Sequence, residues 1–393
     1  MPKTAAGRTR LPCLAVAALY AMAVTWPSPL VAQARPRARA LGIPFSGTPG
    51  PLNAITDISG VEVGHTTIIE GNGPLVVGKG PVRTGVTAIF PTGKTWKPVF
   101  AGWFAGNGFG EMTGAPWVVE GGVLGGPVMI TGTYSVGVVR DAVNSWFHEV
   151  LKREIPWHQP VVGETSDAFL NDGLGQHVTK AHVFQALNTA RTGPVPEGNV
   201  GGGTGMVAHG FKGGIGTASR RLAGPFTIGV LVQANYGTRE ALTIAGVPIG
   251  RDIVGAERTR GAHPPEDRDG SIIVVVATDA PLLPHQLERV ARRVPMGIAR
   301  LGSVASNGSG DIFIAFSTAN PGAAAETGVT PIAWLPNGDL TPIFEATVEA
   351  TEEAIVNALV AAETMVGING NAVPALPTDQ VRAILKRYGR LVR

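Results

Sequence analysis

The segment 271–278 limits the possible folds more than any other part of the chain, because its eight residues, SIIVVVAT, are almost all apolar and mostly β-branched. A strand with one wet face alternates apolar and polar residues, whereas a continuously apolar strand is covered on both faces. Further strand-like runs occupy 60–69, 85–90, 227–234 and 311–318. Helical segments lie between them without the strict alternation of a doubly wound sheet. We therefore predict a layered α/β sandwich, formed as one large domain.

Apolar residues also recur at helical spacing in three segments, 139–151, 287–298 and 346–367. This spacing places them on one face of each predicted helix, where they would pack against a sheet. Gly367 stands where the third helix is expected to end, since glycine readily adopts the left-handed conformation of a C-cap. A last helix is predicted with Thr378 as its N-cap and its end at Gly389.

The N-terminus has the pattern of a secretory signal over residues 1–34. A basic start precedes an apolar run at 11–24, and the Ala-Gln-Ala motif at 32–34 fits a cleavage site. A retained membrane anchor is the alternative, but the run is short for a span of about 20 residues, and Pro27 and Pro29 follow it. We expect export to the periplasm or the medium, and no membrane contact once the signal is removed.

Charge and cysteine content limit which partners and cross-links are expected for the exported protein. The pI of 9.1 suggests nucleic-acid binding, but Lys3, Arg8 and Arg10 carry as much positive charge as the whole chain's net +3. The remainder is nearly neutral, so nucleic acid is not an expected partner. The single cysteine, Cys13, lies in the signal and leaves no disulfide. Charged residues make up 16%, against about 25% in ordinary domains. Much surface is therefore hidden, which indicates either a homo-oligomer or a fold whose layers bury both faces of a sheet.

Several familiar motifs are incomplete. The run Gly203–Ala208 satisfies G-x-G-x-x-A, but no clear strand leads into it, so tight turns and close packing explain it better than a dinucleotide. The segment PTGKT at 91–95 lacks the first glycine of a phosphate loop, because Ala88 stands there. The histidines show no HExxH, and Gly-x-Ser-x-Gly is absent. We expect no metal and no cofactor.

The junction between the polar segment 254–270 and the apolar run holds a serine, Ser271, directly after Gly270. Such a serine often just opens a strand after a turn. Cleavage of the Gly270–Ser271 bond would instead give Ser271 a hydroxyl and a free α-amine, whose pKa of about 7.7 to 8.0 suits a general base. Nucleophile and base would then share one residue. Both interpretations are open from these residues alone.

A set of long motifs, in order along the chain, resembles the L-aminopeptidase/D-esterase family, which includes the β-peptidyl aminopeptidases. The resemblance runs from about residue 41 to the C-terminus and is carried by EGNVGGGTGM (197–206), FKGGIGTASR (211–220), GVLVQANYG (229–237), DGSIIVVVATDAPLLPHQLERVARR (269–293), SNGSGDIFIAFSTAN (306–320) and ATEEAIVNALVAAETMVG, which ends at Gly367.

The resemblance implies a fold, a maturation step and a reaction. The fold is a four-layer αββα sandwich, shared with ornithine acetyltransferases and resembling N-terminal nucleophile hydrolases. A precursor would cut itself at Gly270–Ser271 into an α chain, 35–270, and a β chain, 271–393. The mature enzyme would be an oligomer of αβ units, a tetramer by resemblance, without metal or cofactor.

The resemblance also implies roles for individual residues. Ser271 corresponds to the nucleophile, and Ser309 and Asp311 correspond to the serine and acidic residue beside it, although some members have glutamate at the latter position. Asn235 corresponds to the asparagine that stabilises the oxyanion. Glu164 corresponds to the glutamate that binds the substrate's ammonium group. Ser166 stands where some relatives carry an aromatic residue.

The function implied is that of an aminopeptidase acting on short peptides, amides and esters through an acyl-enzyme on Ser271. The N-terminal residue would be a small L-residue, a D-alanyl group or a β-amino acid. One alternative is an acyltransferase of the ornithine acetyltransferase type, although that family has threonine at the cut. The other is a secreted binding protein in which Ser271 is inert.

Overall fold

Two β-sheets carry the fold of the computed structural model, which describes residues 1–2, 36–95, 97–153, 158–260, 270–325 and 327–392. The predicted signal at 1–34 therefore lies, apart from Met1 and Pro2, outside the described residues. The smaller sheet has the order β1 (Glu62–Glu70), β2 (Val82–Phe90), β5 (Val128–Gly132), β6 (Val161–Thr165). The larger has the order β4 (Val123–Leu124), β3 (Val99–Gly108), β12 (Gly310–Ser317), β11 (Ser271–Thr278), β10 (Thr227–Asn235), β9 (Gly214–Arg221).

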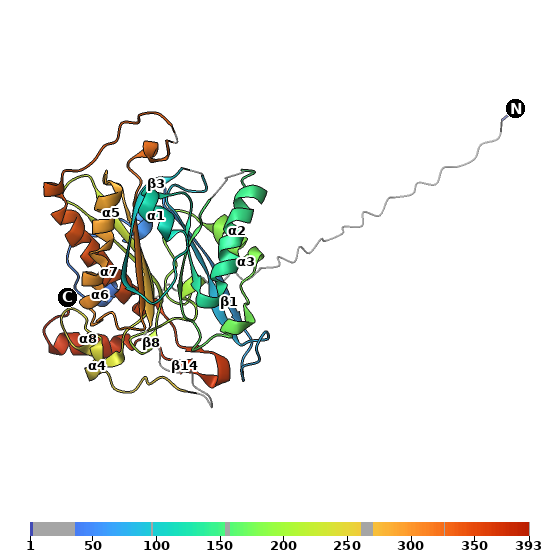
Figure 1. The fold of residues 1–393 in the computed structure, drawn as a ribbon. Helices are drawn as coiled ribbons and strands as arrows, with labels where there is room; N and C mark the ends of the chain where they lie inside the picture. The colour runs from blue at the N-terminus through green and yellow to red at the C-terminus, as the bar shows by residue number, and fades with distance from the viewer. Residues whose placement is uncertain (3–35, 96, 154–157, 261–269, 326, 393) are drawn as a thin grey trace. The chain divides into compact units, whose positions relative to one another are not determined.

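Helices cover the outer face of each sheet within the unit Arg35–Arg393, as Figure 1 shows. Apolar residues of α2 (Val136–Glu149) and α3 (Lys180–Thr189) pack on the smaller sheet. Residues of α5 (Pro284–Ala291), α6 (Val294–Ala299) and α7 (Thr341–Ala361) pack on the larger. A third buried cluster lies between the sheets. These four layers confirm the predicted αββα sandwich.

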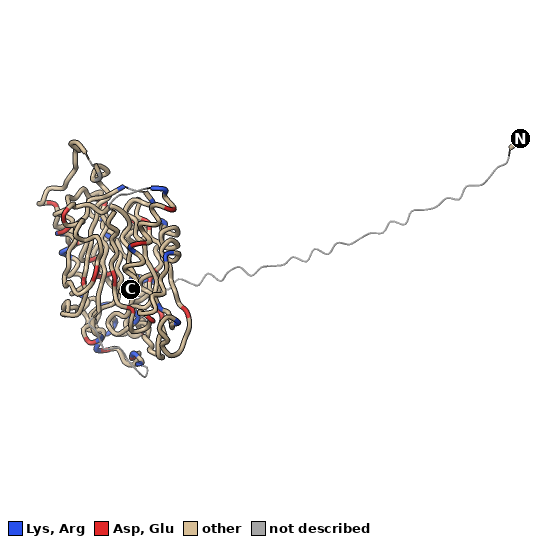
Figure 2. Tube along the Cα trace, turned by 45° about the vertical axis from the view of Figure 1, so that its right-hand side comes forward, with Lys and Arg blue, Asp and Glu red and all other residues tan. Residues whose placement is uncertain are grey.

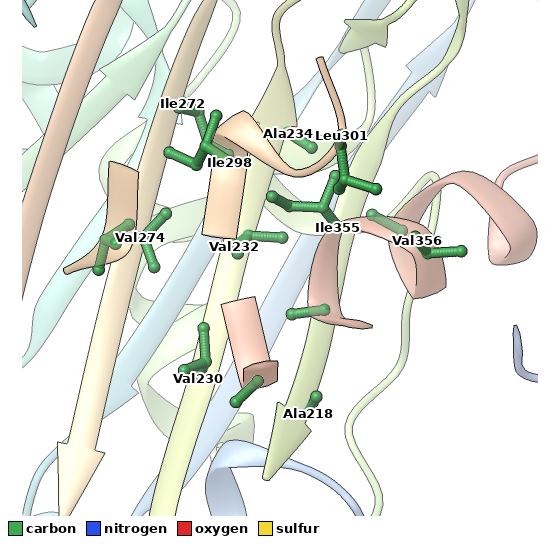
Figure 3. Packing of buried hydrophobic residues seen from close by; sticks show 14 of the residues in the cluster. Ala218, Val230, Val232, Ala234, Ile272, Val274, Ile298, Leu301, Ile355 and Val356 are labelled. Atoms are coloured by element: carbon green, nitrogen blue, oxygen red, sulfur yellow. The ribbon is translucent and has the colours of Figure 1, made fainter. Parts of the chain in front are cut away.

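The central strands are buried along their whole length, as their apolar runs predict. Strand β11 alternates between two cores: Ile272, Val274 and Val276 face the helices, whereas Ile273 and Val275 face the other sheet. Full burial of such side chains stabilises the fold by about 1.5–3 kcal/mol each. Figure 3 shows the helix-side core, with labelled side chains from β9, β10, β11, α6 and α7 and from the turn after α6: Ala218, Val230, Val232, Ala234, Ile272, Val274, Ile298, Leu301, Ile355 and Val356.

Two of the helix predictions need correction. The segment 287–298 forms two helices, because Pro295 has no N–H to continue the first one and instead lies in the opening turn of α6. The third predicted helix ends at Ala361, and Gly367 is not its cap, since its φ is −123°. Glycine is required there for space: a Cβ would lie 2.1 Å from the carbonyl oxygen of Leu170.

The remaining elements are the C-terminal helix, which packs on the helix-side core, and several short segments. The last helix, α8, spans Thr378–Arg387, so Thr378 is its first residue rather than its cap, which is Pro377. Basic and acidic residues are interspersed along the described chain (Figure 2). In the part of the chain that is described, no helix has the length and apolar character needed to cross a bilayer. The other α-helices and strands are α1 (Ala115–Gly121), α4 (Ile249–Asp252) and the two hairpins β7–β8 (Val207–Ala208, Phe211–Lys212) and β13–β14 (Met365–Val366, Ala372–Val373), and short 3₁₀ helices lie between the elements.

Candidate active site

Ser271 and Asn235 form a directly opposed pair at one end of the larger sheet. Ser271 begins β11, Asn235 ends β10, and the antiparallel register pairs them. The side chains of directly opposed residues project to the same face of a sheet. Here it is the face toward the smaller sheet, because Ile273, two residues along the strand from Ser271, packs in the core between the sheets. Ser271 and Asn235 are nearly buried, at 7% and 6% exposure. The hydroxyl and the side-chain amide thus share one small space.

Gly270 lies against the backbone of β10. A Cβ on this residue would be 1.7 Å from the carbonyl oxygen of Asn235 and 2.6 Å from Cα of Tyr236. No other residue fits without moving the strand end, so glycine before Ser271 is a requirement of packing. The bond that precedes the serine is therefore held close to Asn235 in the intact chain.

A cavity of about 810 Å³ opens beside this pair, within the size range of small-molecule sites. Both sheets contribute to it, because β6 supplies Glu164 and β10 and β11 supply Asn235 and Ser271. Of its described lining residues, those singled out from the sequence are Glu164, Ser166, Asn235, Gly270 and Ser271.

Glu164 is a buried carboxylate at the wall of this cavity. Its oxygens accept hydrogen bonds from the backbone N–H of Glu111, over 3.1 Å, and from the hydroxyl of Thr133. Burial raises the pKa of Glu164, an effect that these two hydrogen bonds partly offset. A bound cation such as an ammonium group would favour the charged form, so the site is suited to one.

Ser309 and Asp311 lie beside the start of β11 on the neighbouring strand, where Gly310 pairs with Ser271. The Ser309 hydroxyl donates to Oδ1 of Asp311 over 2.5 Å, and both residues are buried. Burial raises the pKa of Asp311, and the hydrogen bond from Ser309 opposes that shift. Burial, and secondarily the charge of Asp311, raises the pKa of Tyr236.

Sequence patterns missed three residues that shape the site. The backbone N–H of Val207 donates to Oδ1 of Asn235 over 2.8 Å and so fixes the orientation of the amide. Thr133 binds Glu164, and Tyr236 lines the cavity. Val207 acts through its backbone and Thr133 comes from a segment distant from Glu164, so no local motif reveals them, whereas Tyr236 follows Asn235 directly but its place in the cavity wall depends on the packing of the sheets.

The glycine-rich run Gly203–Ala208 is tightly packed, which agrees with the interpretation that its glycines allow close backbone contacts. A Cβ at Gly203 would lie 2.4 Å from the backbone nitrogen of Ile215, and one at Gly205 would lie 2.3 Å from the carbonyl oxygen of Arg83. Among the residues that the structure describes, no group of three or more His, Cys, Asp or Glu side chains is arranged to hold a metal ion.

Known proteins resemble this chain in sequence and in fold. Residues 53–373 match peptidase family S58. The β-peptidyl aminopeptidase BapA of Sphingosinicella microcystinivorans is 54% identical over 370 residues, which cover 91% of this chain and 93% of that protein. BapA of Sphingosinicella xenopeptidilytica is 49% identical over 377 residues, 90% and 92% of the two chains.

Solved structures agree. The L-aminopeptidase D-Ala-esterase/amidase of Ochrobactrum anthropi, described as a prototype for the serine aminopeptidases and a variant of the Ntn hydrolase fold, superposes with a TM-score of 0.83. It is 46% identical, and the match covers 91% of this chain and all of that one. The Burkholderia sp. β-aminopeptidase gives a TM-score of 0.81 at 46% identity, covering 90% and 99%.

The fold, the serine at a strand start beside a cavity, and these likenesses define a serine aminopeptidase of the N-terminal nucleophile type. The family match covers residues 53–373, which is most of the chain, and BapA is 54% identical to it, so the family itself can be assigned. The chain belongs to peptidase family S58.

Proposed function

We propose that the chain is a precursor that cuts itself between Gly270 and Ser271, and that Ser271 then acts as the aminopeptidase nucleophile. The observation that carries this proposal is the pairing of Ser271 with Asn235 at the cavity, with Gly270 pressed against the same strand end. The products would be an α chain, 35–270, and a β chain, 271–393.

Self-cleavage in this scheme needs no external reagent except water. The Ser271 hydroxyl oxygen attacks the Gly270 carbonyl carbon, the C–N bond to Ser271 breaks, and the nitrogen takes up the proton as an α-amine. Water then hydrolyses the resulting ester, which leaves a carboxylate on Gly270 and frees the hydroxyl of Ser271. The close approach of Gly270 to Asn235 supports this step, because it confines the bond to one geometry.

The same groups would serve the peptidase reaction. The free α-amine takes the proton of the Ser271 hydroxyl as the oxygen attacks the substrate carbonyl, and it returns the proton to the leaving amine. The Nδ2 of Asn235 stabilises the oxyanion, and Ser309 and Asp311 orient the new amine. Water releases the acyl group in the second half of the cycle.

Glu164 would select substrates with a free N-terminus, since its buried carboxylate favours an ammonium group over a neutral one. We propose that β-amino acid N-termini are among the preferred substrates. The identity to two β-peptidyl aminopeptidases supports this preference, and the exposed Ser166 in the cavity leaves space for an extended N-terminal residue.

Export and oligomerisation belong to the proposal as well. The signal-like pattern at 1–34 supports export to the periplasm or the medium. Exposed aromatic side chains such as Phe109, Trp117 and Trp334, at 65%, 54% and 53%, support burial against further copies of the chain. Light scattering of the purified protein would give the oligomeric state.

The decisive experiment is Ser271→Ala, analysed by intact mass and N-terminal sequencing. The wild type should give a fragment that begins Ser-Ile-Ile-Val, and Ser271→Ala should give one uncut and inactive chain. The matched control, Ser306→Ala, removes another cavity hydroxyl and should still split and hydrolyse β-alanyl p-nitroanilide. A Ser271→Ala protein that splits at this bond, or that hydrolyses the anilide, contradicts the proposal.

A further inference from the structure

Lys212 is a fully buried cation that the proposed reaction does not use. It lies in β8 with 0% exposure, and Nζ donates to three backbone carbonyls: Met206 over 2.8 Å, Gly213 over 2.9 Å and Gly203 over 3.2 Å. An ammonium group has three donors and no acceptor, so these bonds use all of them. Burial lowers the pKa of Lys212 to about 7, because the charge is removed from water.

Two of these carbonyls, of Gly203 and Met206, precede β7, and the third, of Gly213, follows β8. In the hairpin β7–β8, Val207 pairs with Lys212, and the turn has left-handed residues at His209 and Gly210. The N–H of Gly213 also donates to the carbonyl of Met206, over 2.9 Å. The lysine therefore closes the open end of the hairpin, where β7 and β8 meet the glycine-rich run.

The contacts that begin at Lys212 lead to Asn235, the residue proposed to stabilise the oxyanion. The carbonyl of Met206 is bound by Lys212, and the N–H of the next residue, Val207, binds Oδ1 of Asn235. A side-chain amide presents an acceptor at one end and a donor at the other. A donor fixed at the oxygen end leaves Nδ2 at the other end, on the face that Asn235 shares with Ser271.

We infer that Lys212 is a positioning residue: by holding the carbonyls of Gly203, Met206 and Gly213, it fixes the Val207 N–H that orients Asn235 for the oxyanion. This inference rests on the proposed role of Asn235. Lys212 itself is no base or nucleophile, because its three donors are engaged and its side chain is fully buried.

The test compares Lys212→Met with a second buried cation at the other end of the sheet. Arg220 is 1% exposed and also donates to backbone carbonyls, and the register of β9 with β10 places it beside Ile228, far along the strands from Asn235. Loss of either cation should lower the melting temperature. Only Lys212→Met should lower kcat, by about tenfold or more, with KM within threefold of wild type. Arg220→Met should leave kcat unchanged.

A double-mutant cycle separates positioning from general destabilisation. Precursor splitting and β-alanyl p-nitroanilide hydrolysis are measured for wild type, Lys212→Met, Asn235→Ala and the double variant. If Lys212 acts through Asn235, Lys212→Met should lower either rate less than threefold in the Asn235→Ala background. Equal factors in both backgrounds overturn the inference. If Asn235→Ala is too slow to measure, the single variant decides: a kcat within threefold of wild type overturns it.

A folding failure is also informative. Lys212→Gln keeps two donors for the three carbonyls and replaces Lys212→Met in the same cycle if the latter does not fold. If neither variant gives folded protein, as judged by circular dichroism, Lys212 supports the whole core rather than one amide, and the inference is overturned. Failure of the proposed function is distinct, because it appears as activity in Ser271→Ala.

Discussion

Asn235 and Ser271 are cross-strand partners, the last residue of β10 against the first residue of β11, with their side chains on the face toward the cavity. This relationship places a hydrogen-bond donor beside a hydroxyl at the point where the chain enters the sheet. Since strand pairing fixes both backbones, the two groups need no conformational search before reaction.

Asn235→Ala should lower kcat for β-alanyl p-nitroanilide by about 10²- to 10³-fold, because removal of one oxyanion donor costs about that much. KM should stay within threefold, since the contact forms in the transition state. The control Asn307→Ala changes an exposed asparagine of the loop before β12 and should leave kcat unchanged. A KM effect as large as the kcat effect would contradict an oxyanion role.

Glu164→Gln should raise KM by about 10- to 100-fold, which corresponds to loss of a charge-assisted hydrogen bond. Burial raises the pKa of Glu164, so its charge is lost as the pH falls through that raised value. Protonation of the Ser271 α-amine and of Glu164 should therefore both lower wild-type kcat/KM on the acid side, and only the contribution of Glu164 should be absent from the variant. Glu111→Gln, which removes a neighbouring exposed carboxylate but keeps the backbone donor, is the control.

Gly270→Ala should slow precursor splitting on the order of 100-fold, because the new Cβ would overlap the carbonyl oxygen of Asn235 and displace the bond to be cut. The measurement is the fraction of uncut chain over time by intact mass. Gly224→Ala is the matched control, since a Cβ at Gly224 has no described atom within 4 Å. Splitting of Gly270→Ala at the wild-type rate would show that the close approach is irrelevant.

Asp311→Asn should lower kcat about 100-fold, within the range of acid–base catalysis, because it removes the charge proposed to orient the Ser271 amine. Asp279→Asn provides the comparison. Asp279 is partly buried, has a raised pKa, and follows the opposite end of β11. It should change stability with little effect on kcat. Equal kcat losses in the two variants would argue against a special role for Asp311.

Asp167 gives a prediction about stability. Burial raises the pKa of Asp167 to about 6, from 3.8. A raised folded-state pKa gives stability that is present below pH 3.8 and lost as the pH rises to about 6, by at most about 3 kcal/mol. The melting temperature of Asp167→Asn, relative to wild type, should therefore increase from pH 4 to pH 7. Asp141→Asn, on the exposed side of α2, should show no such trend.

Much of the fold was predictable because it depends on local patterns. The apolar run at 271–278 coincides with β11, and full burial of that strand is what a sandwich requires. The predictions failed where a local signal had another cause. Gly367 was expected to end a helix, but it meets a distant carbonyl instead, and the position of Leu170 is not encoded near it.

The residues of the candidate site were likewise predictable only in part. The resemblance singled out Ser271, Asn235 and Glu164, and the structure brings all three to one cavity. It could not find the Val207 N–H or Lys212, because a backbone donor has no side-chain signature and a buried lysine looks like any other in sequence.

By itself the sequence determined which segments are strands, that they are covered on both faces, and that a serine follows a glycine at the start of one of them. Only the tertiary structure decided that Asn235 faces Ser271, that Gly270 has no room for a Cβ, and that Glu164 lines the cavity from the other sheet. The physical reason is sequence separation. Strand propensity and the apolar pattern depend on a few neighbouring residues, whereas a reactive site requires segments far apart in the chain to pack together.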